Sequence, residues 1–471
     1  MLIDHHRVTT ADASEVRSPY DNRVVGLVPV GTADHLDQAL AAARARHAAG
    51  ALPAHQRARI LDRAADALER DSEAFAQLIT AESAKPITTA RTEVARATDT
   101  FRFAAAVART ATGEMVPLDA SSAGGHKLGF TLRLPIGVVA AITPFNFPLN
   151  LVAHKVAPAI AAGCPVVLKP ASATPLTALR LATMLTEECG LPPGWLNVVT
   201  CDGATASHLT THDDVALVTF TGSAPVGWKI RQAAPRKRVS LELGNNAPVI
   251  IEPDSAIADV AHRVAIAANS FAGQSCISVQ RVYVHHDIAD AFTDALAAEV
   301  AALVVGDPAD DATNVSALIN PKETSRVCDV VAAAVADGAR VVTGGQVRAL
   351  GSNGVLEPTV LTGVTPTMDV SATEVFGPVL GVASYTTLDE AITMANDTTY
   401  GLQAGIFTTD IANAMATARQ LNFGGVMVNE VPTWRADQMP YGGVGESGNA
   451  KEGPAWTVRE MTIERMVAID W

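Results

Sequence analysis

The sequence predicts an α/β protein built on parallel, doubly wound sheets. From Gly137 onward, short apolar strand-like segments alternate with helical segments, and this βαβ alternation is typical of parallel sheets. The 471 residues, 48% of them hydrophobic, suffice for two or three domains with large cores.

The N-terminal part is predicted to be helical and to lead into a β-hairpin. Between residues 32 and 109 apolar side chains recur at helical spacing, as at Leu61 and Leu68. Residues 113–137 alternate polar and apolar side chains around a glycine turn, which indicates a hairpin. The tail 456–471 alternates in the same way and is a candidate partner for that hairpin.

Two α/β runs follow the hairpin. In the first run the expected strands are 138–143, 165–169, 196–199, 216–219 and 239–243, with helices at 151–162, 177–189 and 226–234. In the second run the expected strands are 248–251, 279–285, 341–343 and 379–384, with helices at 257–271, 288–304, 322–337, 388–395 and 411–421.

Composition narrows the functional classes. A net charge of −14 disfavours nucleic acid as a partner, since phosphate binding needs a basic face. We find no run of 18 apolar residues and no signal peptide, so no membrane partner is expected. The five cysteines form no CxxC pair, which predicts a reducing, cytoplasmic location without disulfides or a bound metal.

Cys276 is the first candidate for chemistry. Gly273 and Ser275 leave room beside the sulfur, but no basic residue precedes it within four positions. A free thiol is only a few per cent ionised at neutral pH, so another group has to activate it. Glu242, in an apolar strand, is the candidate helper. The alternative is that Cys276 is a buried small hydrophobic residue.

Seven short motifs then occur in one order. They are TPFNFP (143–148), KPAS (169–172), FTGS (220–223), LELG (241–244), GQSC (273–276), EVFGPV (374–379) and MPYGGVGESG (439–448). Together they make nearly the whole chain resemble the NAD(P)-dependent, non-acylating aldehyde dehydrogenases. In motif detail it looks most like the lactaldehyde and phosphonoacetaldehyde dehydrogenase branch of that family.

The resemblance implies an architecture of three parts. A Rossmann-like cofactor domain would comprise residues 1–112 and 136–244, an α/β catalytic domain 245–434, and a small β oligomerisation flap 113–135 with 454–471. An isolated β-flap is marginally stable, so the resemblance implies pairing with a second subunit in a homodimer or homotetramer.

The resemblance also implies the catalytic residues. Cys276 would attack the aldehyde, Asn146 would bind the resulting oxyanion, and Glu242 would activate the water that hydrolyses the thioester. Two prolines stiffen the segment around Asn146, and burial at a strand end raises the pKa of a carboxylate such as Glu242. Asn245 stands where the family commonly has a second glycine, and asparagine tolerates the left-handed backbone that such a turn requires.

NADP, NAD or both are implied as cofactors. The cofactor-binding positions implied by the motifs are Thr143, Pro144, Phe145, Lys169, Ser172, Gly222, Ser223, Gly244, Glu374 and Phe376. Ser172 replaces the glutamate of many NAD-preferring relatives and so removes repulsion of a 2′-phosphate. In isolation, FTGS would be read as a tight turn with an N-cap serine, and Lys169 as a solvated side chain.

Three residues are candidates for binding the aldehyde. Arg102, His154 and Arg435 match tunnel-lining positions of the resembling relatives, which favours a short hydroxylated or anionic aldehyde. Ser275 departs from the arginine that often precedes the cysteine in phosphate-binding relatives. The alternative is that the arginines form surface ion pairs and His154 packs in a helix.

Two rival functions differ from hydrolytic oxidation. One is a CoA-acylating semialdehyde dehydrogenase, against which Glu242 argues because activated water would destroy the thioester. The other is a catalytically silent binding protein on the same fold, against which the joint presence of the motif residues argues.

Overall fold

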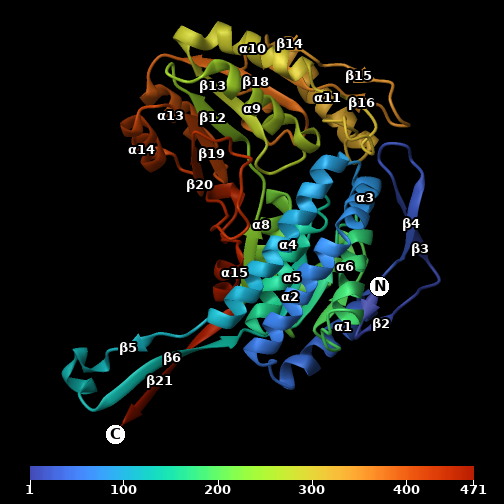
Figure 1. Cartoon of the computed structure of the whole chain (residues 1–471), viewed down its shortest axis with the longest axis vertical. Helices are drawn as coiled ribbons and strands as arrows, with labels where there is room; N and C mark the ends of the chain where they lie inside the picture. The colour runs from blue at the N-terminus through green and yellow to red at the C-terminus, as the bar shows by residue number, and fades with distance from the viewer. Residues whose placement is uncertain (471) are drawn as a thin grey trace.

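Two seven-stranded sheets organise residues 1–470, the part of the chain that the computed structural model describes, and a β-flap projects from one end (Figure 1). The flap ends near the C-terminus, and the N-terminus lies at the edge of the first sheet. Each sheet is covered on both faces, as parallel sheets require.

The first sheet belongs to the N-terminal half. Its strands, in spatial order, are β11 (Arg238–Glu242), β10 (Val215–Thr221), β7 (Val138–Ile142), β8 (Val166–Lys169), β9 (Leu196–Val198), β1 (Leu2–Ile3) and β2 (His6–Arg7). The five strands from β11 to β9 pair in parallel, and β1 joins β9 antiparallel. The chain runs from β7 outward to β9 and then returns to β10, so the strand order reverses between β7 and β10.

Helices cover both faces of this sheet. They are α1 (Ala33–Ala48), α2 (Ala54–Arg70), α3 (Ser72–Ser83), α4 (Ile87–Thr110), α5 (Asn150–Ala162), α6 (Leu176–Glu187), α7 (Gly203–Thr211) and α8 (Ala224–Ala233). Alternate residues of β7 enter different cores: Val139 and Ala141 pack with α2, α4, α5 and α6, whereas Val138 and Ala140 pack with α1 and α7. This alternation explains why every residue of β7 is apolar and buried.

The second sheet forms the other large domain. Its spatial order is β14 (Arg340–Thr343), β17 (Thr359–Thr362), β18 (Val379–Tyr385), β13 (Val279–His285), β12 (Ala247–Ile251), β19 (Gln403–Phe407) and β20 (Gly425–Val428). All neighbours pair in parallel except β14 with β17. The helices of this domain are α9 (Ile257–Asn269), α10 (Ala289–Ala301), α11 (Pro321–Ala336), α12 (Asp369–Ala372), α13 (Leu388–Asn396) and α14 (Ile411–Gln420).

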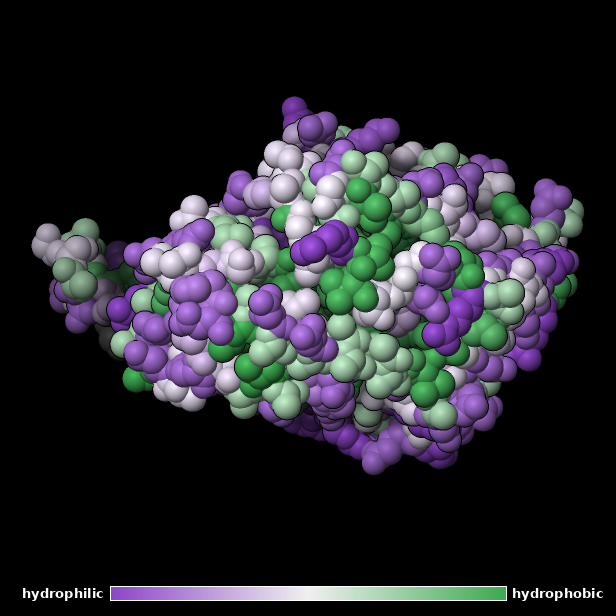
Figure 2. All heavy atoms as spheres, turned by 90° about the horizontal axis from the view of Figure 1, so that it is seen from above, coloured by the Kyte–Doolittle hydropathy of each residue, from purple (hydrophilic) through white to green (hydrophobic). Residues whose placement is uncertain are grey.

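The outer end of this domain mixes polar and apolar side chains, with apolar ones gathered near the middle of the face (Figure 2). Edge strand β14 exposes about 40% of Val341 and Val342. Two small hairpins complete the fold: β3 (Ala13–Arg17) with β4 (Val24–Pro29), and β15 (Val347–Arg348) with β16 (Val355–Leu356).

The flap is a three-stranded antiparallel sheet of β5 (Met115–Val116), β6 (Lys127–Pro135) and β21 (Thr462–Asp470). β21 pairs with β6 from Thr462–Pro135 to Asp470–Lys127, so the predicted pairing of tail and hairpin is confirmed. The segment before β21 differs from the expected flap, because α15 (Pro454–Glu460) packs on α5 and α4. Trp471, the last residue of that expected segment, lies outside the described residues.

The α/β class predicted from the sequence is confirmed, and the predicted strands and helices agree with the structure to within a few residues. The sequence did not predict the short or weakly patterned elements β1, β2, β3, β4, α7, β15, β16, β17, α12, β19 and β20. Among the described residues, no helix is both long and apolar enough to cross a membrane.

Candidate active site

The motif residues gather where the carboxyl ends of the first sheet's strands meet the amino ends of the second sheet's strands. In open α/β sheets, ligands bind at the carboxyl ends of strands where the strand order reverses. Here Thr143, Pro144 and Phe145 follow β7, and Gly222 and Ser223 lie at the end of β10, the two strands at the reversal. The sheet topology therefore brings separate motifs to one crevice.

Cys276 lies in an unusual turn between α9 and β13. Phe271, Ala272 and Gly273 adopt consecutive left-handed conformations, with φ of 50°, 53° and 70°. A Cβ at Gly273 would lie 2.1 Å from the carbonyl oxygen of Gly377, so only glycine fits. Such strained backbone is costly and is found at functional sites.

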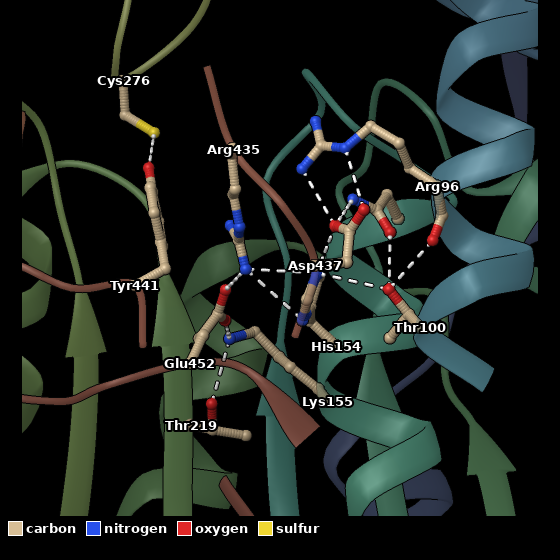
Figure 3. Close-up of polar contacts among 11 residues, drawn as sticks. Arg96, Thr100, His154, Lys155, Thr219, Cys276, Arg435, Asp437, Tyr441 and Glu452 are labelled. Carbon is tan, nitrogen blue, oxygen red and sulfur yellow. Dashed lines mark hydrogen bonds and ion pairs between the residues drawn. The ribbon is translucent and has the colours of Figure 1, made fainter. Parts of the chain in front are cut away.

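The Cys276 side chain is partly buried and faces a cavity of about 440 Å³. Its Sγ lies 2.9 Å from Oη of Tyr441 (Figure 3). Burial raises the pKa of the Cys276 thiol to about 12, although the hydrogen bond with Tyr441 acts in the opposite direction. The thiol is therefore protonated at neutral pH in this state, and its activation has to come from another group.

Asn146 lies against the cysteine segment and is almost fully buried. Its Nδ2 donates a hydrogen bond to the carbonyl oxygen of Gln274 at 3.0 Å, two residues before Cys276. Its Oδ1 is buried without a hydrogen-bond partner among the described residues. The amide group is thus positioned beside Cys276, with a donor that an incoming oxygen could take over.

Glu242 ends β11 and is buried with both carboxylate oxygens unpartnered among the described residues. Burial raises its pKa well above the usual value, and the negative charge of Glu452 adds to the shift. Gly442 keeps the space beside it open, because a Cβ there would lie 2.6 Å from Oε1 of Glu242. A buried carboxylate without partners is suited to taking up a proton.

The turn after Glu242 differs from what the sequence suggested. Asn245 is absent from the non-glycine residues with left-handed backbone in the described chain, so tolerance of that conformation is not why asparagine fits. Instead, its N–H donates to Oε1 of Glu374 at 2.9 Å and its Nδ2 donates to the carbonyl oxygen of Gln403 at 3.1 Å. The side chain fastens the turn to the second domain.

The candidate cofactor residues offer groups suited to a dinucleotide. Lys169, at the end of β8, is largely buried, and burial lowers its pKa. The carboxylate of the nearby Asp202 is the N-cap of α7 and accepts the N–H of Thr205 at 2.7 Å. Because Asp202 is engaged there and forms no ion pair with Lys169, the Lys169 ammonium remains available to an anion. Ser223 is the N-cap of α8, whose first N–H groups suit phosphate.

The remaining cofactor candidates frame the same crevice. Ser172 is exposed beside a cavity of about 150 Å³, and its hydroxyl donates to the carbonyl oxygen of Cys201 at 3.2 Å. A Cβ at Gly244 would lie 2.4 Å from Oε2 of Glu374, so a larger residue there would displace that carboxylate. Phe376 meets the ring of Phe145 edge-on, with centroids 5.9 Å apart. These residues fit a bound dinucleotide.

The wall of the large cavity carries three arginines. Arg435, as predicted, is one of them, with its guanidinium 3.7 Å from the ring centroid of Tyr441 and 3.3 Å from Glu452. Arg96 and Arg263, which the sequence reading missed, are the other two. Arg96 binds both oxygens of Asp437 at 2.9 and 3.1 Å, and Arg263 pairs with Glu430 at 2.5 Å.

The other two predicted substrate residues lie elsewhere. Arg102 does not line the cavity: it is exposed and forms ion pairs with Asp66 at 3.2 Å and Glu69 at 2.6 Å, so its predicted substrate role is corrected to a surface one. Arg96 and Arg102 share α4, but six residues place their side chains on different faces.

His154 is fully buried behind the wall and does not line the large cavity. Its Nε2 lies 2.9 Å from Oδ1 of Asp437 and 3.1 Å from the guanidinium of Arg435 (Figure 3). Burial and the charge of Arg435 lower its pKa, so the imidazole is neutral. His154 therefore supports Arg435 and Asp437 rather than touching a ligand in the cavity.

Comparison with known proteins agrees with this geometry. The pattern of the aldehyde dehydrogenase family matches residues 7–467. A 3-sulfolactaldehyde dehydrogenase of Priestia megaterium is 43% identical over 463 residues, which is 98% of this chain and 96% of that protein.

Two solved structures share the fold. Aldehyde dehydrogenase 21 from Physcomitrella patens, in complex with the reaction product succinate, superposes with a TM-score of 0.95 at 38% identity, covering 100% of this chain and 97% of the other. Glyceraldehyde-3-phosphate dehydrogenase GapN from Methanocaldococcus jannaschii, complexed with NADP, superposes with a TM-score of 0.93 at 34% identity, covering 98% and 100%. The chain therefore belongs to the aldehyde dehydrogenase family and is an enzyme that oxidises an aldehyde with NAD(P).

Proposed function

We propose that this enzyme oxidises a short aldehyde with an anionic or hydroxylated end to the carboxylic acid, through a covalent bond to Cys276. The observation that carries the proposal is the large cavity, whose wall presents Cys276 together with Arg96, Arg263 and Arg435. A cysteine supplies the nucleophile, and guanidinium groups suit carboxylate, sulfonate or phosphate oxygens.

The first step begins as the Cys276 thiol releases its proton to water, with the Tyr441 hydroxyl donating a hydrogen bond to the resulting thiolate. The thiolate attacks the aldehyde carbon, which forms the C–S bond and places negative charge on the aldehyde oxygen. The Nδ2 group of Asn146, now bonded to the carbonyl oxygen of Gln274, and the backbone N–H of Cys276 would bind that oxygen. Bound NAD(P) would supply the hydride acceptor, and loss of the hydride from the same carbon would leave a thioester on Cys276.

The second step is hydrolysis of the thioester. Glu242 takes one proton from a water molecule, whose oxygen attacks the thioester carbon, and the acid leaves as the C–S bond breaks. The two unpartnered oxygens of Glu242 and its raised pKa support this role. An activated water competes with CoA for a thioester, so hydrolysis is favoured over CoA acylation.

The anionic end of the substrate would lie against the cavity arginines. The three arginines are held in place by Asp437, Glu430 and Glu452, yet each guanidinium has five N–H donors and retains some for a ligand. The sulfonate named for the Priestia megaterium relative and the succinate named for the Physcomitrella patens structure are anions of this kind.

We further propose a cytoplasmic homodimer or homotetramer assembled through the flap. β5, β6 and β21 expose the large apolar side chains of Met115, Leu132, Met466 and Ile469. A second subunit would cover this surface.

The raised thiol pKa makes a pH-dependent prediction for the enzyme without cofactor or substrate. Iodoacetamide should alkylate Cys276 about tenfold faster for each pH unit between 7 and 9, because the thiolate fraction grows tenfold per unit below the pKa. Peptide mass spectrometry measures the rate at Cys276 itself, and Cys276→Ala corrects for other thiols. A rate that is constant across this range would show that the thiolate already dominates.

Glu242→Gln should separate the two steps. Acylation should persist, so we expect a burst of about one equivalent of reduced cofactor per active site, followed by turnover slowed by roughly 10²-fold or more, because the general base is missing. Stopped-flow absorbance of the reduced nicotinamide measures both phases. Loss of the burst would mean that Glu242 activates the thiol instead.

Arg96→Gln should raise KM for a sulfonated or carboxylated C3–C4 aldehyde roughly 10- to 100-fold, the cost of one charge-assisted hydrogen bond. KM for an unsubstituted aldehyde of equal length should change less than about twofold, since it has no group for the guanidinium. Arg102→Gln is the matched control on the same helix and should change neither. Equal effects of Arg96→Gln on both substrates would contradict the anion site.

NADP should be accepted at least comparably with NAD, because Ser172 offers a hydroxyl and Lys169 a cation near the crevice. Ser172→Glu should raise KM for NADP by about tenfold or more through like-charge repulsion and leave KM for NAD nearly unchanged. Steady-state kinetics with each cofactor tests this, and strict rejection of NADP by the unmodified enzyme would contradict it.

A further inference from the structure

A buried ion pair that the proposed chemistry does not use lies directly behind the catalytic segments. Lys85, just before α4, pairs with Glu93 within α4, and both side chains have no solvent exposure. Taking two charges out of water costs more than such a pair usually returns, and apolar replacements are often as stable. This pair therefore calls for an explanation beyond stability.

Lys85 touches both segments that carry the reacting groups. Its Nζ donates a hydrogen bond of 2.6 Å to the backbone carbonyl oxygen of Asn146. The same Nζ lies 3.8 Å from the ring centroid of Phe147 and 4.6 Å from that of Phe271. Phe147 follows Asn146, and Phe271 begins the left-handed turn that leads to Cys276. One ammonium group thus holds the two segments from behind.

Glu93 fixes the other end of the Asn146 segment. Its Oε1 accepts the backbone N–H groups of Leu149 at 2.9 Å and Asn150 at 3.1 Å, where α5 begins. The N-cap residue of α5, Leu149, has no side chain able to accept these donors, so a carboxylate from α4 serves instead. Residues 146–150 are therefore anchored at the carbonyl of Asn146 and at the first N–H groups of α5.

We propose that Lys85 and Glu93 are positioning residues that set the place of the Asn146 amide relative to Cys276. The inference rests on the proposed role of Asn146 as the oxyanion donor. A displacement of about 1 Å at a catalytic group costs up to 10²-fold in rate. Holding residues 146–150 at both ends therefore raises the reaction rate even where it adds nothing to the free energy of unfolding. Glu93 also forms part of the wall of the large cavity, but its carboxylate is bonded to Lys85 and to the first N–H groups of α5, so the pair acts through the backbone of residues 146–150.

Two neutral double variants test the idea. Lys85→Met with Glu93→Gln removes both charges and the donor to Asn146, but keeps an acceptor oxygen for the start of α5. Lys85→Gln with Glu93→Gln is the matched variant, which is also neutral but retains an N–H donor at position 85. Neither leaves an unpaired buried charge, which single substitutions would do.

The readout is single-turnover formation of reduced cofactor, measured for each variant about 15 °C below its own Tm as a working margin. The Lys85→Met double variant should be slowed about tenfold or more, with KM within about twofold of the unmodified enzyme and NADP binding retained. The Lys85→Gln double variant should recover most of this loss. Added to Asn146→Ala, the Lys85→Met double variant should slow the reaction less than about twofold further, because both changes act on one group.

Several results would overturn the inference. Unmodified rates in the Lys85→Met double variant, equal losses in both double variants, or full additivity with Asn146→Ala would each show that the pair is structural only. If Asn146→Ala alone leaves hydride transfer at the unmodified rate, the oxyanion role of Asn146 falls and the inference falls with it. The first three results leave that role intact, so the two failures are distinguishable.

Discussion

The candidate active site depends on one constraint. The charged side chains buried near Cys276 and Glu242 need partners, while Cys276 and Glu242 themselves have to stay outside these ion pairs. Arg435 is central to the solution. Its guanidinium lies against the ring of Tyr441, which contacts the Cys276 sulfur, and it also pairs with Glu452 and contacts His154 (Figure 3). Most of the buried charges therefore have partners, and the Cys276 sulfur contacts a neutral hydroxyl.

Two buried glutamates in this site have different partners and therefore opposite pKa shifts. Glu452 bonds Lys155 at 3.1 Å and faces Arg435, and these cations lower its pKa to about 2. Glu242, close to the same cations, has no bonded partner within residues 1–470, and burial raises its pKa. One carboxylate is thus a permanent charge that orients cations, and the other is able to exchange a proton, the division of labour seen where paired acids act in catalysis.

The sequence predicted the parts of this site that are encoded locally. Motifs around Cys276, Glu242 and Asn146 specify short turns at strand ends, and the sheet topology then brings them to one crevice. Strand and helix patterns were also sufficient for most elements, because buried parallel strands are continuously apolar.

What the sequence could not give was the orientation of side chains on long helices and the partners of buried charges. Arg102 and Arg96 both lie on α4, and only the packing of that helix decides which of them meets the cavity and which meets Asp66 and Glu69. The pairing of Arg96 with Asp437 joins residues more than three hundred positions apart, which no local pattern reveals. Strand β19 was not predicted because Gln403 and Gly405 interrupt its apolar run.

The partners of the cavity arginines also determine which part of the reaction responds to pH. The cations around Asp437 and Glu452 keep the pKa of each carboxyl below its usual range, so both acids stay ionised at and above mildly acidic pH. Arginine does not titrate in this range, and His154 is held neutral by burial. The part of the proposed anion-binding wall formed by Arg96 and Arg435 with these two acids therefore keeps a nearly constant charge from about pH 5 upward. Cys276 and Glu242 both have raised pKa values, so the reactivity of the bound substrate, rather than its binding, should carry the pH dependence of the enzyme.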